Sequence, residues 1–122
     1  MASISLQKLI DKTKLVNLTP NIDVSKIKIT QPDINRPALQ LAGYFEHFDC
    51  TRVQVIGFVE YTYLEEVADE RKREIYEQLL SYEVPAVVFS RGFICKIYAV
   101  GTRWVFRHDG VFVGWSGVCV VS

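Results

Sequence analysis

A continuous apolar run, Ala86-Val87-Val88-Phe89, is the feature that most restricts how this chain can fold. A strand with one wet face alternates apolar and polar residues, whereas a strand without polar side chains is typical of a parallel sheet that is covered on both faces. Pro85 precedes the run, and the clearest helical pattern in the chain ends just before it. The run therefore predicts a central strand with helices packed against it.

The helical pattern extends from Asp69 to Glu83. Apolar residues at helical spacing form one stripe along it, which we expect to face the core. The stripe consists of Ala68, Ile75, Tyr76, Leu79 and Leu80. The mixed charges from Asp69 to Glu74 are interpreted as a solvated face, not a binding site.

Shorter elements precede this helix. Ser5 is suited to cap a short helix, and we expect a second helix from about Pro37 to Tyr44. A strand is expected at Ile27–Thr30, where apolar and polar residues alternate. Another is expected at Val53–Ile56, which is rich in β-branched residues. Strands separated by helices of this length indicate an α/β fold, namely a small layered domain with a largely parallel sheet flanked by helices.

Residues 94–122 differ in composition from the rest of the chain. Residues 1–93 carry 11 basic and 13 acidic side chains, whereas residues 94–122 carry 3 basic and 1 acidic. This tail is β-prone: Arg103 to His108, the pair Asp109-Gly110, and Val111 to Trp115 match a two-residue hairpin. Unpaired, the apolar run Val118 to Val121 would be prone to aggregation.

Composition argues against several classes of partner. The formal net charge is +0 and the basic residues are scattered, so neither nucleic acid nor anionic lipid is expected as a partner. The sequence contains no uninterrupted apolar stretch of about 18 residues, the length that would predict a membrane-spanning helix. Cys50, Cys95 and Cys119 show neither a C-x-x-C pair nor metal-ligand spacing, so we expect free thiols in the cytoplasm and no metal site.

No catalytic or cofactor-binding motif is evident. The chain contains no G-x-x-x-x-G-K-[ST] loop, which would supply the amides and the lysine that hold a nucleotide's phosphates. His47 lies near Glu46 and Asp49, but neighbours along a loop seldom converge, so we interpret it as a surface residue. We therefore assign no catalytic, cofactor-binding or metal-binding residue.

One polar constellation stands out, the stretch Asp33 to Phe45. Its Asp-x-Asn-Arg start leads into the Pro37 helix, and Arg36 offers a forked set of donors that can receive an anion or a partner's carboxylate. The alternative is purely structural: Asp33 or Asn35 caps the helix and Arg36 pairs with a nearby acid. Both readings stay open on sequence alone. The residues singled out are Asp33, Asn35, Arg36, Pro37, Leu41, Ala42, Gly43 and Phe45.

This stretch also carries a family resemblance. Together with Arg52–Gly57, Glu60–Leu64 and Pro85–Gly92, it resembles the amino-terminal domain of HPr kinase/phosphorylase over residues 29–92. The family commonly has glycine where Ala38 stands. The resemblance implies a fold similar to the amino-terminal domain of Mur ligases.

It also implies a full-length enzyme that is bifunctional, hexameric and cytoplasmic, and that serves carbon catabolite repression and regulation of the phosphotransferase system in bacteria. That enzyme uses ATP and Mg²⁺ to phosphorylate a serine of the phosphocarrier HPr, and removes the phosphate by phosphorolysis. Its phosphate-binding loop belongs to a carboxy-terminal domain, so no catalytic residue is carried over to this chain, and we expect the chain to be inactive alone.

The resemblance stops after Gly92. We therefore expect residues 1–93 to form the family's amino-terminal domain in a truncated chain. We hypothesise that residues 94–122 are an atypical tail, either frameshifted or an unrelated end. The expected role is regulation or assembly. The alternative is a stand-alone cytoplasmic module that binds an anion or a protein partner.

Overall fold

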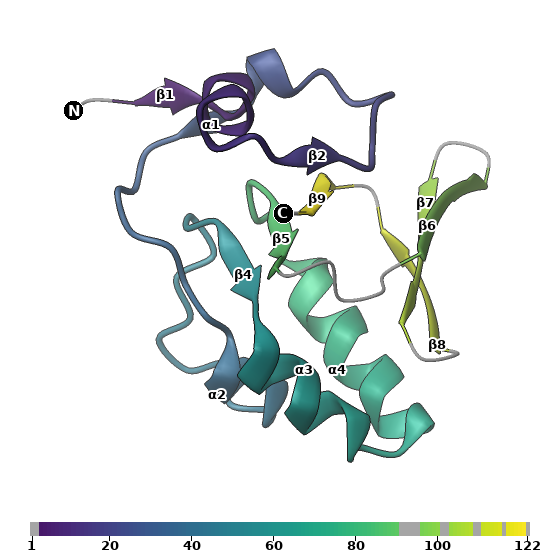
Figure 1. Cartoon of the computed structure of the whole chain (residues 1–122). Coiled ribbons are helices and arrows are strands. Elements are labelled where there is room, and N and C mark those ends of the chain that lie inside the picture. The colour runs from purple at the N-terminus through teal and green to yellow at the C-terminus, as the bar shows by residue number, and fades with distance from the viewer. Residues whose placement is uncertain (1–2, 91–95, 101–102, 109–110, 116, 122) are drawn as a thin grey trace.

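The computed structural model describes residues 3–90, 96–100, 103–108, 111–115 and 117–121. Its centre is a four-stranded sheet in the order β2-β9-β5-β4, formed by β2 (Val16–Asn17), β9 (Cys119–Val121), β5 (Val87–Phe89) and β4 (Gln54–Ile56) (Figure 1). β4, β5 and β9 run parallel, and only β2 is antiparallel to its neighbour. The largely parallel sheet expected from the sequence is confirmed.

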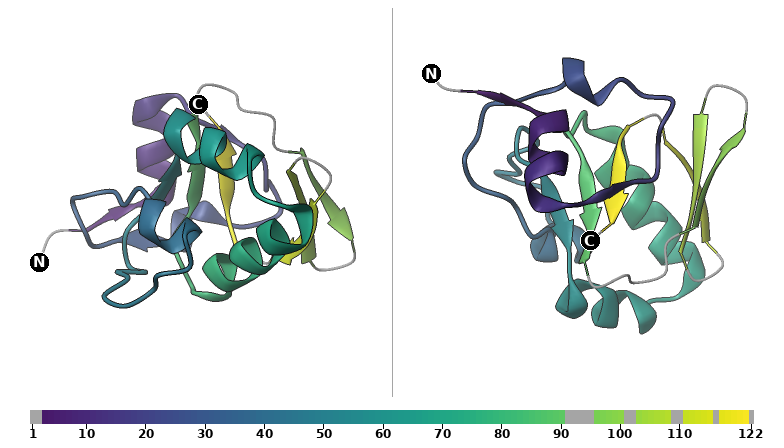
Figure 2. Two further views of the ribbon diagram at one scale, coloured as in Figure 1. Left: turned by 90° about the horizontal axis from the view of Figure 1, so that it is seen from below. Right: turned by 45° about the horizontal axis from the view of Figure 1, so that its top comes forward.

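Helices cover both faces of the sheet, which makes a layered α/β domain (Figure 2). One face carries α1 (Leu6–Thr13), η1 (Val24–Lys26) and the two-stranded sheet of β1 (Ile4–Ser5) and β3 (Lys28–Ile29). The other face carries α2 (Ala38–Leu41), α3 (Phe58–Glu65) and α4 (Asp69–Ser81). The expected likeness to the Mur ligase domain is compatible with this arrangement and stays a prediction.

The central strand β5 has the environment that its apolar run predicts. Val87 and Phe89 lie in the core cluster shared with α3 and α4, whereas Ala86 and Val88 lie in the cluster beneath α1. All of them are buried. A strand can bury consecutive side chains in this way only when both faces of its sheet are covered, because successive side chains point to opposite faces.

The expected helices form, with shifted ends. Ser5 caps α1, and its Oγ accepts a hydrogen bond from the backbone N–H of Lys8 at 3.2 Å. α4 begins at Asp69 as expected, but its buried side includes Lys72, while Ala68 is exposed at the N-cap. Including Ala68 in the core stripe was therefore wrong. The whole Lys72 side chain is buried, and its Nζ lies 4.0 Å from Oδ1 of Asp69.

The tail contains a second sheet and one strand of the first. β6 (Lys96–Val100), β7 (Arg103–His108) and β8 (Val111–Trp115) form an antiparallel sheet that lies against α4 through β8. The pairing of His108 with Val111 confirms the hairpin, and its turn Asp109-Gly110 lies outside the described residues. Cys95 and Arg91-Gly92 lie outside them too.

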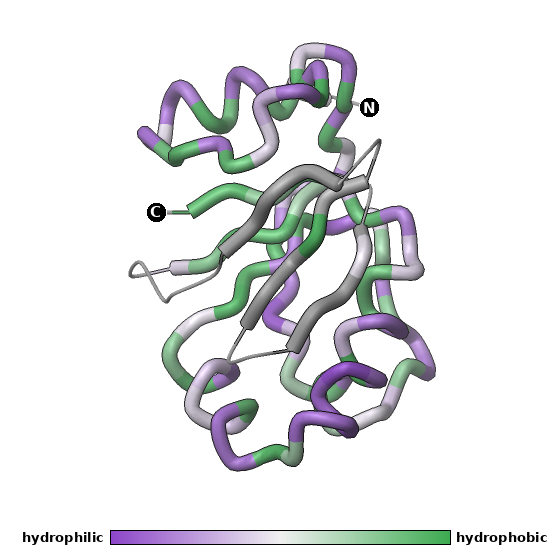
Figure 3. Tube along the Cα trace, turned by 90° about the vertical axis from the view of Figure 1, so that its right-hand side faces the viewer, coloured by the Kyte–Doolittle hydropathy of each residue, from purple (hydrophilic) through white to green (hydrophobic). Residues whose placement is uncertain are grey.

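β9 inserts between β2 and β5, so the tail supplies an inner strand of the main sheet. Val118 and Val120 pack beneath α1, and Cys119 packs towards α4. In Figure 3 the strand beside the C-terminal mark is hydrophobic throughout. The apolar run that would aggregate if unpaired is thus paired on both edges. The boundary expected at residue 93 stays a prediction.

Candidate functional site

The Asp33–Phe45 stretch begins at the outer edge of β4. Asn35 forms an isolated parallel bridge to Gln54: its N–H donates to the carbonyl of Val53 at 2.9 Å, and its carbonyl accepts from Val55 at 2.9 Å. An exposed strand edge invites unwanted pairing, so this bridge also protects the sheet. The stretch is therefore attached to the sheet before the helix starts.

A network of side-chain amides fixes this attachment. The Asn35 amide donates to Gln54 Oε1 at 2.6 Å and lies 3.5 Å from Gln40 Oε1. Gln54 is fully buried, and its own amide donates to the carbonyl of Arg52 at 2.9 Å. Gln40 is also buried and reaches the carbonyl of Tyr44 at 3.4 Å. Buried amides are stable only when their hydrogen bonds are made, so these contacts specify one geometry.

Arg36 forms a two-pronged ion pair with Glu60. Nε donates to Oε1 at 2.8 Å and Nη2 donates to Oε2 at 2.7 Å. The Glu60 side chain is 2% exposed and that of Arg36 is 51% exposed. Oε2 also accepts the N–H of Gly57 at 3.3 Å. We call this set of Arg36, Glu60 and Gly57 the Arg36 clamp.

The clamp keeps Glu60 ionised. Burial alone would raise the pKa of its carboxyl, but the hydrogen bonds and charge of Arg36, with backbone hydrogen bonds, outweigh burial and hold that pKa below its usual value. The hydrogen bonds and charge of Glu60 in turn raise the pKa of Arg36. A carboxylate held in this way is a poor proton acceptor, so Glu60 is not suited to general-base chemistry.

Gly57 leaves room for the guanidinium. A Cβ at this position would lie 2.5 Å from Nη2 of Arg36, which is closer than real Cβ contacts allow. Glu60 stands at the third position of α3, from which its carboxylate reaches back to the helix's first N–H groups. The clamp thus joins the start of α2 to the start of α3.

The remaining motif residues support packing. Pro37 occupies the N-cap of α2, and no side chain caps this helix, so the expectation that Asp33 or Asn35 caps it is wrong. Leu41 is fully buried in the core. Ala42 is exposed at the C-cap, and Gly43 follows with a φ of 95° that favours glycine. Phe45 stacks on Tyr82 with 5.4 Å between ring centroids.

Asp33 is not part of the clamp. It is exposed, and within the described part of the chain its carboxylate makes no hydrogen bond or ion pair. The structure therefore brings together Asn35, Arg36 and the helix they precede, and leaves Asp33 beside a separate groove.

The other candidate groups behave as surface or core residues. His47 is exposed with a φ of 63°, and its Nε2 lies 3.5 Å from Glu46 Oε1. Cys50 and Cys119 are free thiols. Across the described ranges, no three His, Cys, Asp or Glu side chains gather as a metal site would require. None of the helices described here is long and apolar enough to cross a membrane.

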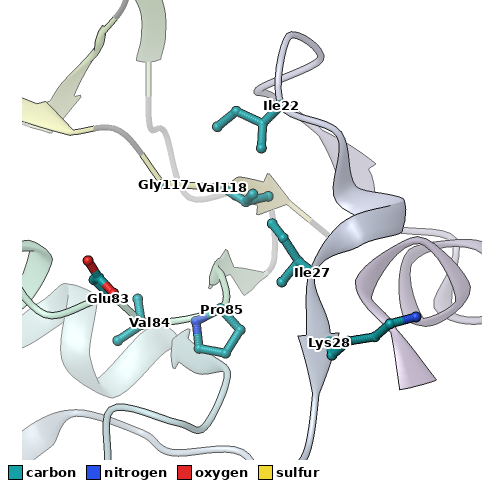
Figure 4. Close-up of a pocket in the computed structure, with 8 residues that line it drawn as sticks. All are labelled: Ile22, Ile27, Lys28, Glu83, Val84, Pro85, Gly117 and Val118. Carbon is teal, nitrogen blue, oxygen red and sulfur yellow. The ribbon is translucent and has the colours of Figure 1, made fainter. Parts of the chain in front are cut away.

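A small cavity of about 290 Å³ lies where the segment around η1 meets the end of the main sheet (Figure 4). Ile22, Ile27, Pro85 and Val118 form its apolar wall. Its volume is at the lower limit for a small-molecule site, and it contains no convergent polar groups apart from one lysine and one glutamate. It does not extend the clamp.

Sequence reasoning missed the partners of Arg36 and Asn35. Glu60 lies 24 residues from Arg36 and Gln54 lies 19 residues from Asn35, so no local spacing connects them. One signal was available: Gly57 followed three residues later by Glu60 resembles a helix start with an acidic third residue.

Comparisons with known proteins place this geometry in context. Residues 4–100 match the family model described as HPr Serine kinase N terminus. The chain is 49% identical over 92 residues to an HPr kinase/phosphorylase of Lachnoclostridium phytofermentans, and 37% identical over 92 residues to one of Alkaliphilus metalliredigens. Each match covers 75% of this chain but only 30% and 29% of those relatives. The chain thus spans less than a third of the length of the curated relatives it matches.

Proposed function

This chain belongs to the HPr Serine kinase N terminus family, and from that membership we propose that it serves as a non-catalytic domain in the regulation or assembly of an HPr kinase/phosphorylase. It is the amino-terminal domain of that kind of enzyme. Such a domain acts through its folded structure and takes no part in the chemical reaction.

The observation that supports this role most directly is the Arg36 clamp. Within the most distinctive polar motif of the chain, the Asn35 amide donates to Gln54, and Nε and Nη2 of Arg36 donate to Glu60. A catalytic carboxylate needs access to a proton on its substrate, whereas Glu60 is buried and doubly hydrogen-bonded to Arg36. The motif thus fits a structural and positioning role.

For the full-length enzyme we propose the chemistry that the relatives' name indicates: phosphorylation and dephosphorylation of HPr. ATP and Mg²⁺ would be the phosphoryl donor and its metal, a hexamer the assembly, and the cytoplasm the location, with carbon catabolite control as the process. The residues of this chain do not fit a nucleotide or its metal: the sequence has no phosphate-binding loop, and the described residues hold no cluster of metal ligands. No step of that reaction is therefore assigned to this chain.

A phosphoryl-transfer assay tests the proposal. The chain is incubated with HPr, Mg²⁺ and γ-labelled ATP, and the Lachnoclostridium relative serves as the positive control. We expect labelled HPr from the relative and none from this chain. Labelling of HPr by this chain alone would overturn the non-catalytic assignment, provided that the rate rises and falls with the amount of the chain across the purification fractions.

A stand-alone binding module is the second candidate. The observation in its favour is β9, because the chain completes an inner position of its main sheet with its own residues 119–121. The Arg36 clamp is a poor binding site for such a module, since Glu60 already occupies the Nε–Nη2 side of the guanidinium. A pull-down in which Arg36→Ala binds the same partners as the wild type would place any binding surface elsewhere.

A further inference from the structure

A second concave site shares no residue with the Arg36 clamp. It is a groove of about 510 Å³ between the β1–β3 sheet and the segment that leads from β3 to Asn35. Its volume falls within the range of small-molecule sites. The residues that line it are Ser3, Ile4, Leu9, Ile29, Thr30, Gln31, Pro32, Asp33, Ile34 and Val53. We call it the Ile34 groove.

The floor of the groove is part of the hydrophobic core. Ile29 and Val53 are buried in the cluster beneath α1, and Leu9 packs against that cluster. The rim is apolar and exposed: Ile34 is 53% exposed and Ile4 is 38% exposed. An apolar body seated between them would remove this surface from water, and that burial is the main source of affinity in small-molecule sites.

The charge of the lining restricts which ligand fits. Asp33 is the one ionisable side chain among the lining residues, and no lysine, arginine or histidine accompanies it. Its carboxylate makes no hydrogen bond or ion pair with the described residues. A sugar phosphate or nucleotide would meet this negative charge with no cation to offset it, whereas an ammonium group would form a charge-assisted hydrogen bond.

The backbone beside Asp33 adds hydrogen-bonding capacity. From Thr30 to Ile34 the chain belongs to no helix or strand, and no backbone hydrogen bond to the described residues engages the N–H groups of Asp33 and Ile34. Thr30 and Gln31 contribute a hydroxyl and an amide to the lining. The groove thus combines an apolar floor with a few polar groups near its single charge.

We propose that the Ile34 groove binds a small organic cation, a molecule with an apolar body and one ammonium group that pairs with Asp33. The single carboxylate of Asp33 is complementary in charge to the ammonium group, and the apolar floor of the groove is suited to the apolar body. This site is separate from the Arg36 clamp, and it stands whether or not the chain serves an HPr kinase/phosphorylase.

Three matched probes test the proposal: hexylammonium, 1-hexanol and hexanoate. They share one apolar chain and differ in the charge of the head group. The readout is the shift of isoleucine δ1-methyl signals in NMR spectra of the labelled full chain. We expect saturable shifts at Ile4, Ile29 and Ile34 and unchanged signals at Ile75, which lies in the other core cluster.

Hexylammonium should bind about two- to fivefold more tightly than 1-hexanol, the range expected for one exposed charge pair, and hexanoate should bind most weakly. Added salt should reduce the ammonium preference because it screens an exposed pair. Equal affinity for the three probes would overturn the cationic class of ligand. Absence of saturable shifts up to the solubility limit would overturn the site itself.

Two variants separate the charge from the apolar floor. Asp33→Asn should abolish the preference for hexylammonium over 1-hexanol while leaving the affinity for 1-hexanol unchanged. Ile34→Ala should weaken all three probes, whereas Leu39→Ala, which changes another exposed apolar residue outside the groove, should weaken none. A preference that persists in Asp33→Asn, or an equal loss in Leu39→Ala, would contradict the proposed contacts. Because Asp33, Ile34 and Leu39 are all exposed, the variants should fold.

Discussion

Replacing Val120 by alanine tests whether the last strand of the chain belongs to the core of the domain. Val120 is fully buried in β9, between β2 and β5. The substitution removes two methyl-sized groups, worth about 1.6 kcal/mol of transfer free energy. The cavity left in a packed core adds about 1 kcal/mol, so we expect a loss of about 2.5 kcal/mol in the free energy of unfolding.

A matched control comes from the neighbouring strand. Val16 in β2 is 57% exposed, so Val16→Ala should change stability by less than about 0.5 kcal/mol. Urea unfolding followed by far-UV circular dichroism, under reducing conditions, measures both variants. For a chain of this size the loss in Val120→Ala corresponds to a fall of about 10 °C in the melting temperature. Equal small effects in the two variants would refute the insertion of β9 into the sheet.

Further predictions concern the Arg36 clamp and the turn after α2. The pKa of Glu60 is lowered by folding, so its ionised form contributes stability that is present above its usual value of 4.5 and is lost as pH falls through the lower folded value. Glu60→Gln should therefore lower stability by about 1–2 kcal/mol at pH 7 and flatten the loss of stability between neutral and acidic pH, measured as urea midpoints; an unchanged pH profile would contradict the pairing. Gly57→Ala should displace Arg36 and give the same flattened profile, because the added Cβ would lie 2.5 Å from its guanidinium; a wild-type profile would show that the clamp survives. Gly43→Ala should lower stability by about 1 kcal/mol or slightly more without altering the pH profile, because a residue with a side chain is strained at a φ of 95°; a stabilising effect in thermal melts would contradict that geometry.

The features predictable from sequence are those set by neighbouring residues. The apolar run of β5, the Ser5 cap of α1 and the start of α4 at Asp69 follow from local patterns, and the structure confirms each. α3 was not predicted, since its apolar residues do not lie on one stripe: Phe58 and Val59 are exposed, whereas Leu64 is buried. Its start depends on the clamp, which forms only in three dimensions.

Contacts between distant residues could not be read from spacing. The sequence identified Arg36 as a forked hydrogen-bond donor. It left open whether the acceptor is a carboxylate of this chain or an anion from outside it. The structure identifies Glu60 as the acid, 24 residues away. Val118 to Val121 were recognised as a run that needs partners, yet pairing with β2 and β5 requires closure of the whole fold. Asp33 was grouped with the motif by sequence and lies outside its network in space.

The central claim is that this chain carries the family's amino-terminal domain and acts through its fold. The most direct test is a chimera in which residues 1–93 replace the corresponding segment of the Lachnoclostridium HPr kinase/phosphorylase, which then supplies its own continuation of the chain. The measurement is the rate at which the chimera phosphorylates HPr, with its oligomeric size checked by light scattering. The account predicts activity close to that of the parent enzyme. A chimera that folds to the parent's size but does not phosphorylate HPr would contradict it.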